Sequence, residues 1–250
     1  MASVLELQSI RKNRSGDGNV QLFANVSATI ADPAIISILG VSGQGKSTLL
    51  RLLAGLDNAD EGDIRLHNVS QRELDPRIWR MKVCYVAQQS VMLNGSIEQN
   101  LRTVSMLHRM PYDEKLVRHM LPRLGLDHLD MGKSAEQLSG GEKQRISLLR
   151  SLLLHPTVLL LDEITASLDR GSKEMVEEVL REWHHQEGAT MLWVTHDLEQ
   201  AQQMSSSIWF MGEGTLLENS DTAAFFEHPT SELAQNYIKA PIQKEQPCQS

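Results

Sequence analysis

A glycine-rich segment with one lysine and three hydroxyl residues indicates where the chain can bind an anion. The segment reads Gly40-Val41-Ser42-Gly43-Gln44-Gly45-Lys46-Ser47-Thr48. Its glycines let backbone N–H groups close around an anion, Lys46 adds a positive charge, and the Ser47 hydroxyl is a suitable ligand for Mg²⁺. Residues 35–39 predict a buried strand before it, and residues 47–55 predict a helix whose N-terminus faces the anion. Together they predict a binding site for the phosphates of a nucleotide.

Two adjacent carboxylates follow an apolar run further along the chain. Residues 158–161 are Val-Leu-Leu-Leu, and Asp162 and Glu163 come directly after them. A strand buried on both faces of a parallel sheet needs such a run, and ligands bind at the carboxyl ends of these strands. Asp162 is therefore predicted to hold Mg²⁺, partly through water, and Glu163 to polarise the water that attacks the γ-phosphate. The phosphate-binding segment upstream favours this interpretation over a solvated acidic turn.

A second glycine pair opens another predicted helix. In Ser139-Gly140-Gly141-Glu142 the serine and the glutamate form the S-x-x-E pattern of a capping box, and the glycines leave backbone N–H groups open to an anion. The cap alone indicates only a helix start. The whole string from Ser139 to Ser147 is what suggests a functional segment.

The predicted strands and helices that position these segments alternate in the order typical of α/β proteins. Strand and helix alternate in the second half of the chain, and the stretch 96–154 is mostly helical, with breaks predicted at Pro111, Pro122 and Gly125. Residues 11–19 are polar and predict a turn. The strands are expected at residues 4–10, 20–30, 35–39, 62–66, 82–86, 158–161, 190–194 and 208–211, and the later helices at 172–187 and 197–204.

Composition excludes several functional classes. The formal net charge of −8 argues against a broad surface for nucleic acid. No apolar stretch approaches the length that spans a bilayer. Cys84 and Cys248 form no C-x-x-C pair, which fits a reducing cytoplasm.

These segments together resemble the nucleotide-binding subunit of ABC transporters over roughly residues 4–220. The resemblance rests on six matches in order: Walker A at 40–48, the Q-loop glutamine Gln88, the signature at 139–144, Walker B at 158–163, the D-loop at 167–169, and the switch histidine His196 in Thr195-His196-Asp197. It implies a P-loop NTPase fold with a mostly parallel core sheet, an N-terminal antiparallel β subdomain and a helical lobe inserted at about residues 89–155. A single domain would span residues 1–240, with a flexible tail at 241–250.

The resemblance also implies ATP and Mg²⁺ as ligands and assigns roles at the site. Catalysis would fall to Glu163, His196 and Gln88. ATP would be bound by residues 40–48, and Mg²⁺ by Ser47, Gln88 and Asp162. In a head-to-tail dimer, Ser139, Gly140, Gly141 and Glu142 would close on the ATP of the other copy, beside the D-loop residues Ser167 and Asp169.

A separate membrane permease is the second partner that the resemblance implies. It would dock in the groove around residues 88–100, where Val91-Met92-Leu93 is apolar; a small satellite core is the alternative for these three residues. The chain would then lie on the cytoplasmic side, peripheral to the inner or cell membrane, with no nucleic-acid partner.

One departure from the family pattern concerns adenine. The family usually places an aromatic residue after the first strand, but residues 10–15 contain none. Arg14 or Lys12 falls near the expected position, and a guanidinium plane can stack on a base. We therefore assign Arg14 to the adenine site, with a solvated turn charge as the open alternative.

Only two short sequence segments suggest which substrate is transported. Residues 161–169 and 192–197 resemble bacterial iron-export ATP-binding subunits and plant relatives tied to aluminium tolerance. The sequence therefore predicts an ATP-hydrolysing transporter subunit that drives export of a metal ion such as iron. The alternative is a soluble ABC ATPase of iron–sulfur cluster assembly. A DNA-maintenance ATPase would need a long coiled coil, for which the 93 residues from Lys46 to Ser139 leave no room.

Overall fold

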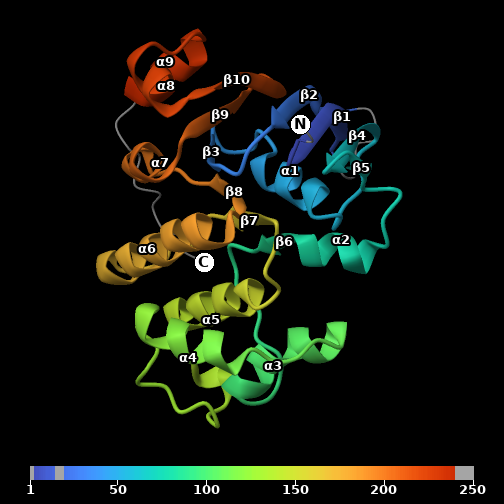
Figure 1. The fold of residues 1–250 in the computed structure, drawn as a ribbon. Helices are drawn as coiled ribbons and strands as arrows, with labels where there is room; N and C mark the ends of the chain where they lie inside the picture. The colour runs from blue at the N-terminus through green and yellow to red at the C-terminus, as the bar shows by residue number, and fades with distance from the viewer. Residues whose placement is uncertain (1–2, 15–19, 240–250) are drawn as a thin grey trace.

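Two β-sheets organise the part of the chain that the computed structural model describes, residues 3–14 and 20–239 (Figure 1). The larger sheet has the strand order β10-β9-β3-β8-β7-β6, and its strands run parallel except β10. The smaller sheet is antiparallel, with the order β2-β1-β4-β5. Parallel neighbours need crossover connections, which explains why helices separate the strands of the larger sheet.

The elements have the following bounds. The strands are β1 (Leu5–Asn13), β2 (Gln21–Ile30), β3 (Ile35–Leu39), β4 (Glu61–Leu66), β5 (Val69–Ser70), β6 (Val83–Val86), β7 (Val158–Asp162), β8 (Thr190–Val194), β9 (Ser207–Gly212) and β10 (Thr215–Asp221). The helices are α1 (Lys46–Leu53), α2 (Pro76–Lys82), α3 (Ile97–His108), α4 (Glu114–Arg123), α5 (Gly140–Leu152), α6 (Arg170–Glu187), α7 (Leu198–Met204), α8 (Thr222–Glu227) and α9 (Glu232–Lys239).

Strand β7 serves two hydrophobic cores at once. Leu159 and Leu161 pack in the core shared with α5 and α6, whereas Val158 and Leu160 pack in the core shared with α1 and the smaller sheet. Successive side chains of a strand point to opposite faces, so a strand covered on both faces must be apolar throughout. Its last residue, Asp162, is therefore a carboxylate at the edge of a dry interior.

Helices α3, α4 and α5 lie on the side of the larger sheet away from the smaller sheet (Figure 1). Each begins with a side-chain cap: Ser96, Asp113 and Ser139 accept hydrogen bonds from backbone N–H groups in the first turn. Such caps satisfy donors that a helix leaves free at its N-terminus. The cap at Ser139 therefore fixes where α5 begins and satisfies one of its first N–H groups.

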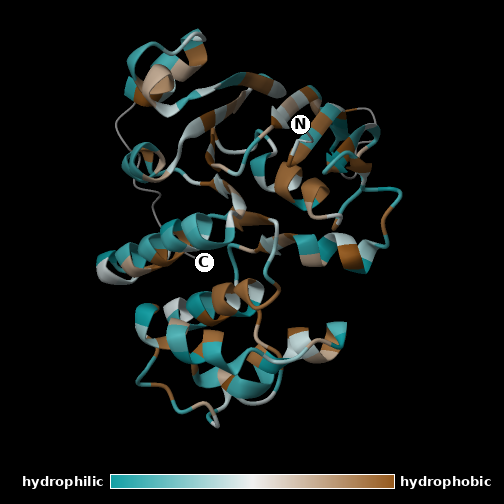
Figure 2. Cartoon of the chain, in the orientation of Figure 1, coloured by the Kyte–Doolittle hydropathy of each residue, from teal (hydrophilic) through white to brown (hydrophobic). Residues whose placement is uncertain are grey.

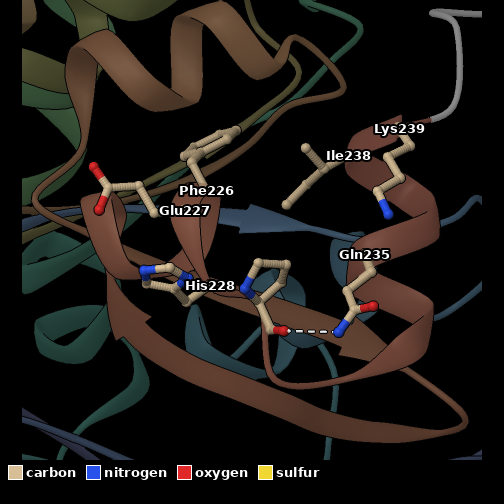
Figure 3. Close-up of a pocket in the computed structure, with 7 residues that line it drawn as sticks. Phe226, Glu227, His228, Gln235, Ile238 and Lys239 are labelled. Carbon is tan, nitrogen blue, oxygen red and sulfur yellow. Dashed lines mark hydrogen bonds between the residues drawn. The ribbon is translucent and has the colours of Figure 1, made fainter.

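The C-terminal helices close a third, smaller core. Phe210 of β9 and Phe225 of α8 lie in it with Leu39, the residue before the glycine-rich segment. A hollow of about 390 Å³ opens between α8 and α9, where Gln235 donates a hydrogen bond to the carbonyl of Pro229 (Figure 3). Its charged groups Glu227 and Lys239 lie on opposite sides of the hollow, so they do not converge on one point (Figure 3).

Hydropathy follows the layers of the fold. Figure 2 shows long hydrophilic stretches on α6 and on the helices below it. Within residues 3–14 and 20–239, every helix falls short of the length and hydrophobicity that crossing a bilayer requires.

The predicted fold class is confirmed: a mostly parallel core sheet, an N-terminal antiparallel sheet and a helical insertion. Three local expectations are wrong. Arg11 to Asn13 continue β1 because they pair with both neighbouring strands. Pro122 lies inside the last turn of α4. Finally, β5, α2, β10, α8 and α9 were not expected, because they are short or lack an apolar period.

The division into one domain and a tail stays a prediction. Residues 241–250, predicted to form a flexible tail, lie outside the described residues, as do residues 15–19 of the predicted turn.

Candidate functional site

The glycine-rich segment forms the loop between β3 and α1, and two of its glycines are required by geometry. Gly40 has φ 140°, and a Cβ there would lie 2.2 Å from the carbonyl oxygen of Met211. Gly45 has φ 89°, and a Cβ would lie 2.8 Å from the ring of Phe23. Any side chain at either position would force backbone or packed aromatic atoms to move. The loop can therefore keep this path only with glycine.

Lys46 is held inside this loop. Its side chain is 6% exposed, and Nζ donates to the carbonyl oxygens of Gly40 at 2.7 Å and Val41 at 3.1 Å. The Gln44 side chain accepts a hydrogen bond from the backbone N–H of Gly214 at 3.4 Å. The positive charge thus lies inside the loop at the first residue of α1, and a helix N-terminus favours a negative group such as phosphate.

Asp162 joins this loop to the sheet. The residue is 3% exposed; its Oδ1 accepts from the Ser47 hydroxyl at 2.8 Å and its Oδ2 from the Tyr85 hydroxyl at 2.7 Å. A carboxylate and a hydroxyl side by side are oxygen ligands of the kind that Mg²⁺ takes together with phosphate oxygens. Within the described residues, no cluster of three or more His, Cys, Asp or Glu suited to a metal ion occurs.

Tyr85 belongs to none of the motifs that the sequence predicted for this site. The pairing of β6 with β7 would have revealed it, because Tyr85 stands opposite Leu160, two residues before Asp162. Burial, and then the hydrogen bond to Asp162, raises the pKa of Tyr85. The phenol therefore stays protonated near neutral pH and acts as the donor of this hydrogen bond.

Three side chains meet beside the loop because three neighbouring strands end there. Gln88 follows β6, Glu163 follows β7 and His196 follows β8. Glu163 Oε1 lies 2.9 Å from His196 Nε2, and Oε2 accepts from Gln88 Nε2 at 2.9 Å. The parallel sheet thus brings together residues that are 75 and 33 positions apart in the chain.

Glu163 is constrained in both backbone and charge. Its φ of 49° lies in the left-handed region, which is uncommon for a residue other than glycine. The hydrogen bond with His196 lowers the pKa of the carboxyl, against the effect of burial, and Lys46 adds to the lowering. The side chain is therefore an anion near neutral pH, as a proton acceptor must be.

A hollow of about 370 Å³ connects the loop with Glu163. Its lining residues are Leu22, Ser42, Gly43, Gly45, Lys46, Ser47, Thr48, Glu163 and His196. The structure thus places the predicted phosphate-binding segment, the predicted base and the switch histidine around one space. Leu22 of β2 is an apolar wall that the sequence analysis did not single out.

The signature segment lies elsewhere in the chain. Ser139 caps α5, and its backbone N–H donates to Glu142 Oε2 at 2.7 Å. This bond is the main reason why the pKa of Glu142 falls to about 2. Figure 1 shows α5 on the far side of the larger sheet from α1. Within the described residues, the hollow at the phosphate loop takes none of its lining from Ser139, Gly140, Gly141 or Glu142.

Two contacts tie α5 to the other motifs. Leu168, between the predicted D-loop residues Ser167 and Asp169, lies so close to Gly141 that a Cβ there would be 3.2 Å from its side chain. Asp169 itself caps α6 by accepting from Ser172 N–H at 3.0 Å. Buried Gln144 donates to the carbonyl of Ala87 at 2.9 Å, next to Gln88. A shift of α5 therefore reaches both the D-loop and the Q-loop backbone.

The two candidates for adenine stacking differ in their contacts. Lys12 donates to Asp57 at 2.9 Å and to the carbonyl of Asn58 at 2.7 Å, so its ammonium is engaged by the loop between α1 and β4. Arg14 is exposed, and among described residues the wall of the hollow does not include it. Its role at adenine stays a prediction.

The apolar segment after Gln88 is exposed in part. Val91 is 69% and Leu93 48% exposed, whereas Met92 packs against the core. Asn100 bonds both the N–H and the carbonyl of Leu93, and Arg150 donates to the carbonyl of Val91 at 3.1 Å. The satellite-core alternative therefore applies to Met92 and is wrong for its two neighbours.

Comparison with known proteins identifies the family. A family model described as "ABC transporter" matches residues 23–166. The putative ABC transporter ATP-binding protein YjkB of Bacillus subtilis is 37% identical over 238 residues, which is 94% of each chain. A solved structure of CbiO1 from Clostridium perfringens, part of the ABC transporter complex CbiONQ, superposes with a TM-score of 0.78 at 26% identity, covering 92% of this chain and 93% of that one.

Other relatives carry names that specify opposite directions of transport. The probable iron export ATP-binding protein FetA of Escherichia coli is 34% identical over 73% of this chain and 81% of its own length. The spermidine/putrescine import ATP-binding protein PotA of Pseudomonas fluorescens is 33% identical over 94% of this chain and 65% of its own length. The chain belongs to the ABC transporter family as an ATP-binding subunit, and members of this family hydrolyse ATP.

Proposed function

We propose that two copies of this chain bind and hydrolyse ATP at shared sites and thereby power a separate membrane permease. The observation that carries the proposal is Glu163, an anionic carboxylate held between Gln88 and His196 at the hollow of the phosphate loop. A base placed beside bound phosphates is what hydrolysis needs.

Glu163 would accept a proton from the attacking water. The water oxygen forms a bond to the γ-phosphorus while the bond from that phosphorus to the β,γ-bridging oxygen breaks, which releases ADP and phosphate. Lys46 and the loop N–H groups stabilise the charge on the phosphate oxygens. Gln88 and His196 each contact one oxygen of Glu163, and each oxygen keeps a further lone pair that can accept a hydrogen bond from the water.

Ser47, Asp162 and Gln88 would hold Mg²⁺, which would offset phosphate charge. In this proposal the Ser47 hydroxyl and the Gln88 amide face the ion, and Asp162 binds it partly through water. The contact between Ser47 and Asp162 supports this donor set.

The second half of each ATP site would come from another copy. Ser139, Gly140, Gly141 and Glu142 offer a capped helix N-terminus, where backbone N–H groups favour a negative group. Their position away from the hollow in one chain supports a head-to-tail dimer, with Ser167 and Asp169 beside the shared site. ATP would close this dimer and hydrolysis would open it.

The permease would dock against the exposed apolar residues Val91 and Leu93, on the cytoplasmic face of the inner or cell membrane. This segment leads directly from Gln88, so a docked helix would bias the open and closed dimers. Asn100 donates a hydrogen bond to the carbonyl of Leu93 and Arg150 donates one to the carbonyl of Val91, and these bonds fix the backbone under the two exposed side chains.

For the cargo, we propose export of a metal ion such as iron. The motif strings at 161–169 and 192–197 and the similarity to FetA support it. PotA, an import subunit, covers more of the chain at nearly equal identity, so direction needs its own test. The iron–sulfur assembly alternative has no counterpart among the relatives described above.

Affinity purification from membranes tests the proposal. The wild-type chain should bring down an integral membrane protein. In reconstituted vesicles, radioactive iron should move from the side that carries the ATPase subunit to the opposite side, and only with ATP. The double variant Val91→Ser/Leu93→Ser should lose the membrane protein but keep the basal ATPase rate. Ile78→Ser, an exposed apolar residue of α2, is the matched control. Recovery of only a cytosolic scaffold would refute the transporter proposal. Movement of iron toward the side that carries the ATPase subunit would refute export.

A further inference from the structure

The two oxygens of Asp162 have different partners on different elements. Oδ1 faces the Ser47 hydroxyl at the start of α1, and Oδ2 faces the Tyr85 hydroxyl on β6. Ser47 belongs to the proposed Mg²⁺ ligands, whereas Tyr85 belongs to none of the motifs. The hydrogen bond from Tyr85 therefore serves a purpose that the motifs do not describe.

The sheet explains how Tyr85 reaches this carboxylate. Tyr85 and Leu160 are partners in the parallel pair β6–β7, and both pack in the core that includes α1. Side chains two residues apart on a strand share a face, so Asp162 lies on the same face as Leu160. The phenol thus runs along the sheet from Tyr85 toward Asp162, under the helix that begins with Lys46 and Ser47.

A carboxylate held at both oxygens has a fixed plane. Asp162 is 3% exposed, so little water is at hand to replace a lost partner. With only the Ser47 contact, the carboxylate could rotate about its last torsion and leave one charged oxygen unpaired in the interior. With Tyr85 in place, Oδ1 is the oxygen directed at Ser47.

We propose that Tyr85 is a positioning residue for Mg²⁺: its hydroxyl holds Oδ2 of Asp162 so that Oδ1 faces Ser47 and the ion. The inference rests on the Mg²⁺ site of the proposed function. Partners that orient a metal-binding carboxylate typically contribute about 10- to 100-fold to metal affinity. The tyrosine acts through Asp162, and it is not among the described residues that line the hollow at the phosphate loop.

Manganese binding in the presence of ADP tests this role without measuring turnover. Mn²⁺ replaces Mg²⁺ and its free concentration is read by electron paramagnetic resonance. Tyr85→Phe keeps the ring in its core and should weaken Mn²⁺ binding about 10-fold or more, while ADP affinity in EDTA stays within about twofold of wild type. Tyr112→Phe, whose ring lies under Arg102, is the matched control and should change neither.

Unchanged Mn²⁺ affinity in a folded Tyr85→Phe protein would overturn the proposal. If Tyr85→Phe does not fold, Tyr85→Phe/Asp162→Asn removes the buried charge as well and should restore folding. A double variant that is equally unfolded would show that the hydroxyl of Tyr85 supports folding by a route other than Asp162, which also overturns the proposal. If wild type binds no Mn²⁺ with ADP, the metal site itself fails, and the role of Tyr85 fails with it.

Discussion

The carboxyl edge of the core sheet and the N-terminus of α5 both carry motif residues. They differ in how many of the groups needed for an ATP site each one gathers within one chain. At the sheet edge, Asp162 and Glu163 each have partners at both oxygens, and Lys46 is buried within its loop. At α5, Ser139 and Glu142 bond each other, Ser139 is exposed, and Glu142 Oε1 also lies 3.0 Å from His128 Nε2. The first region surrounds a hollow within one chain, whereas the second is ordered but contributes nothing to the lining of that hollow among the described residues.

Glu163→Gln should have the largest effect on turnover. The amide keeps the size of the side chain but cannot accept the proton, so the ATPase rate should fall by about 10²- to 10⁴-fold. ATP binding should persist, since the phosphate loop is unaltered. Steady-state phosphate release and equilibrium binding measure the two effects. A rate within about threefold of wild type would take the base role from Glu163.

Lys46→Ala should weaken nucleotide binding itself. The loop loses its buried ammonium, and hydrogen bonds from charged groups contribute about 1.5–3 kcal/mol, so affinity should drop by about 10- to 100-fold. Fluorescence titration with a labelled ATP analogue measures the drop. Lys115→Ala removes an exposed lysine of α4 and is the matched control, with affinity expected to match wild type.

Ser139→Arg should separate the two regions. A long cation at the N-terminus of α5 blocks the approach of another chain but leaves the phosphate loop intact. ATP should therefore bind with wild-type affinity, while ATP-dependent dimers should weaken on the order of 100-fold. Analytical ultracentrifugation with ATP measures the association. Undiminished dimers would disprove the head-to-tail arrangement.

Glu142→Gln should reveal how far α5 supports itself. The pKa of Glu142 is lowered from 4.5 to about 2, chiefly by the Ser139 N–H. Because folding depresses this pKa, the ionised Glu142 carboxylate stabilises the folded state above about pH 4.5. This stabilisation disappears as the pH falls toward about 2 and below. The substitution should cost about 1 kcal/mol of unfolding free energy at neutral pH and only about a quarter of that near pH 2.5. Urea titrations at both pH values compare variant and wild type; a pH-independent difference would contradict this account.

Arg14→Ala should have the smallest effect. If the guanidinium stacks on adenine, affinity for ATP should fall by about 2- to 5-fold relative to CTP, which has a smaller base. Arg77→Ala removes an exposed arginine of α2 and should leave the ratio unchanged. Equal losses for both nucleotides would indicate a phosphate contact, and no loss would assign Arg14 to solvent.

Sequence patterns predicted the parts of the site that local chemistry dictates. The loop at 40–48 and the carboxylates after residues 158–161 could be recognised because a tight anion loop needs glycine and a doubly covered strand needs an apolar run. Tyr85 and Leu22 could not, since their roles depend on which strands become neighbours. Arg11 to Asn13 look polar and turn-like, yet they form a strand because the neighbouring strands pair with them. Tertiary pairing of this kind leaves little mark on single-residue patterns.

Subunit complementation tests most directly whether each ATP site needs two chains. Lys46→Ala and Ser139→Arg proteins should each hydrolyse little ATP alone. When the two are mixed in equal amounts at a concentration that saturates association, up to half of the dimers should be heterodimers, and each of these retains one site with an intact loop from one chain and an intact α5 from the other. Activity should rise to at most about a quarter of wild type. A mixture no more active than the two separate proteins would contradict the shared site.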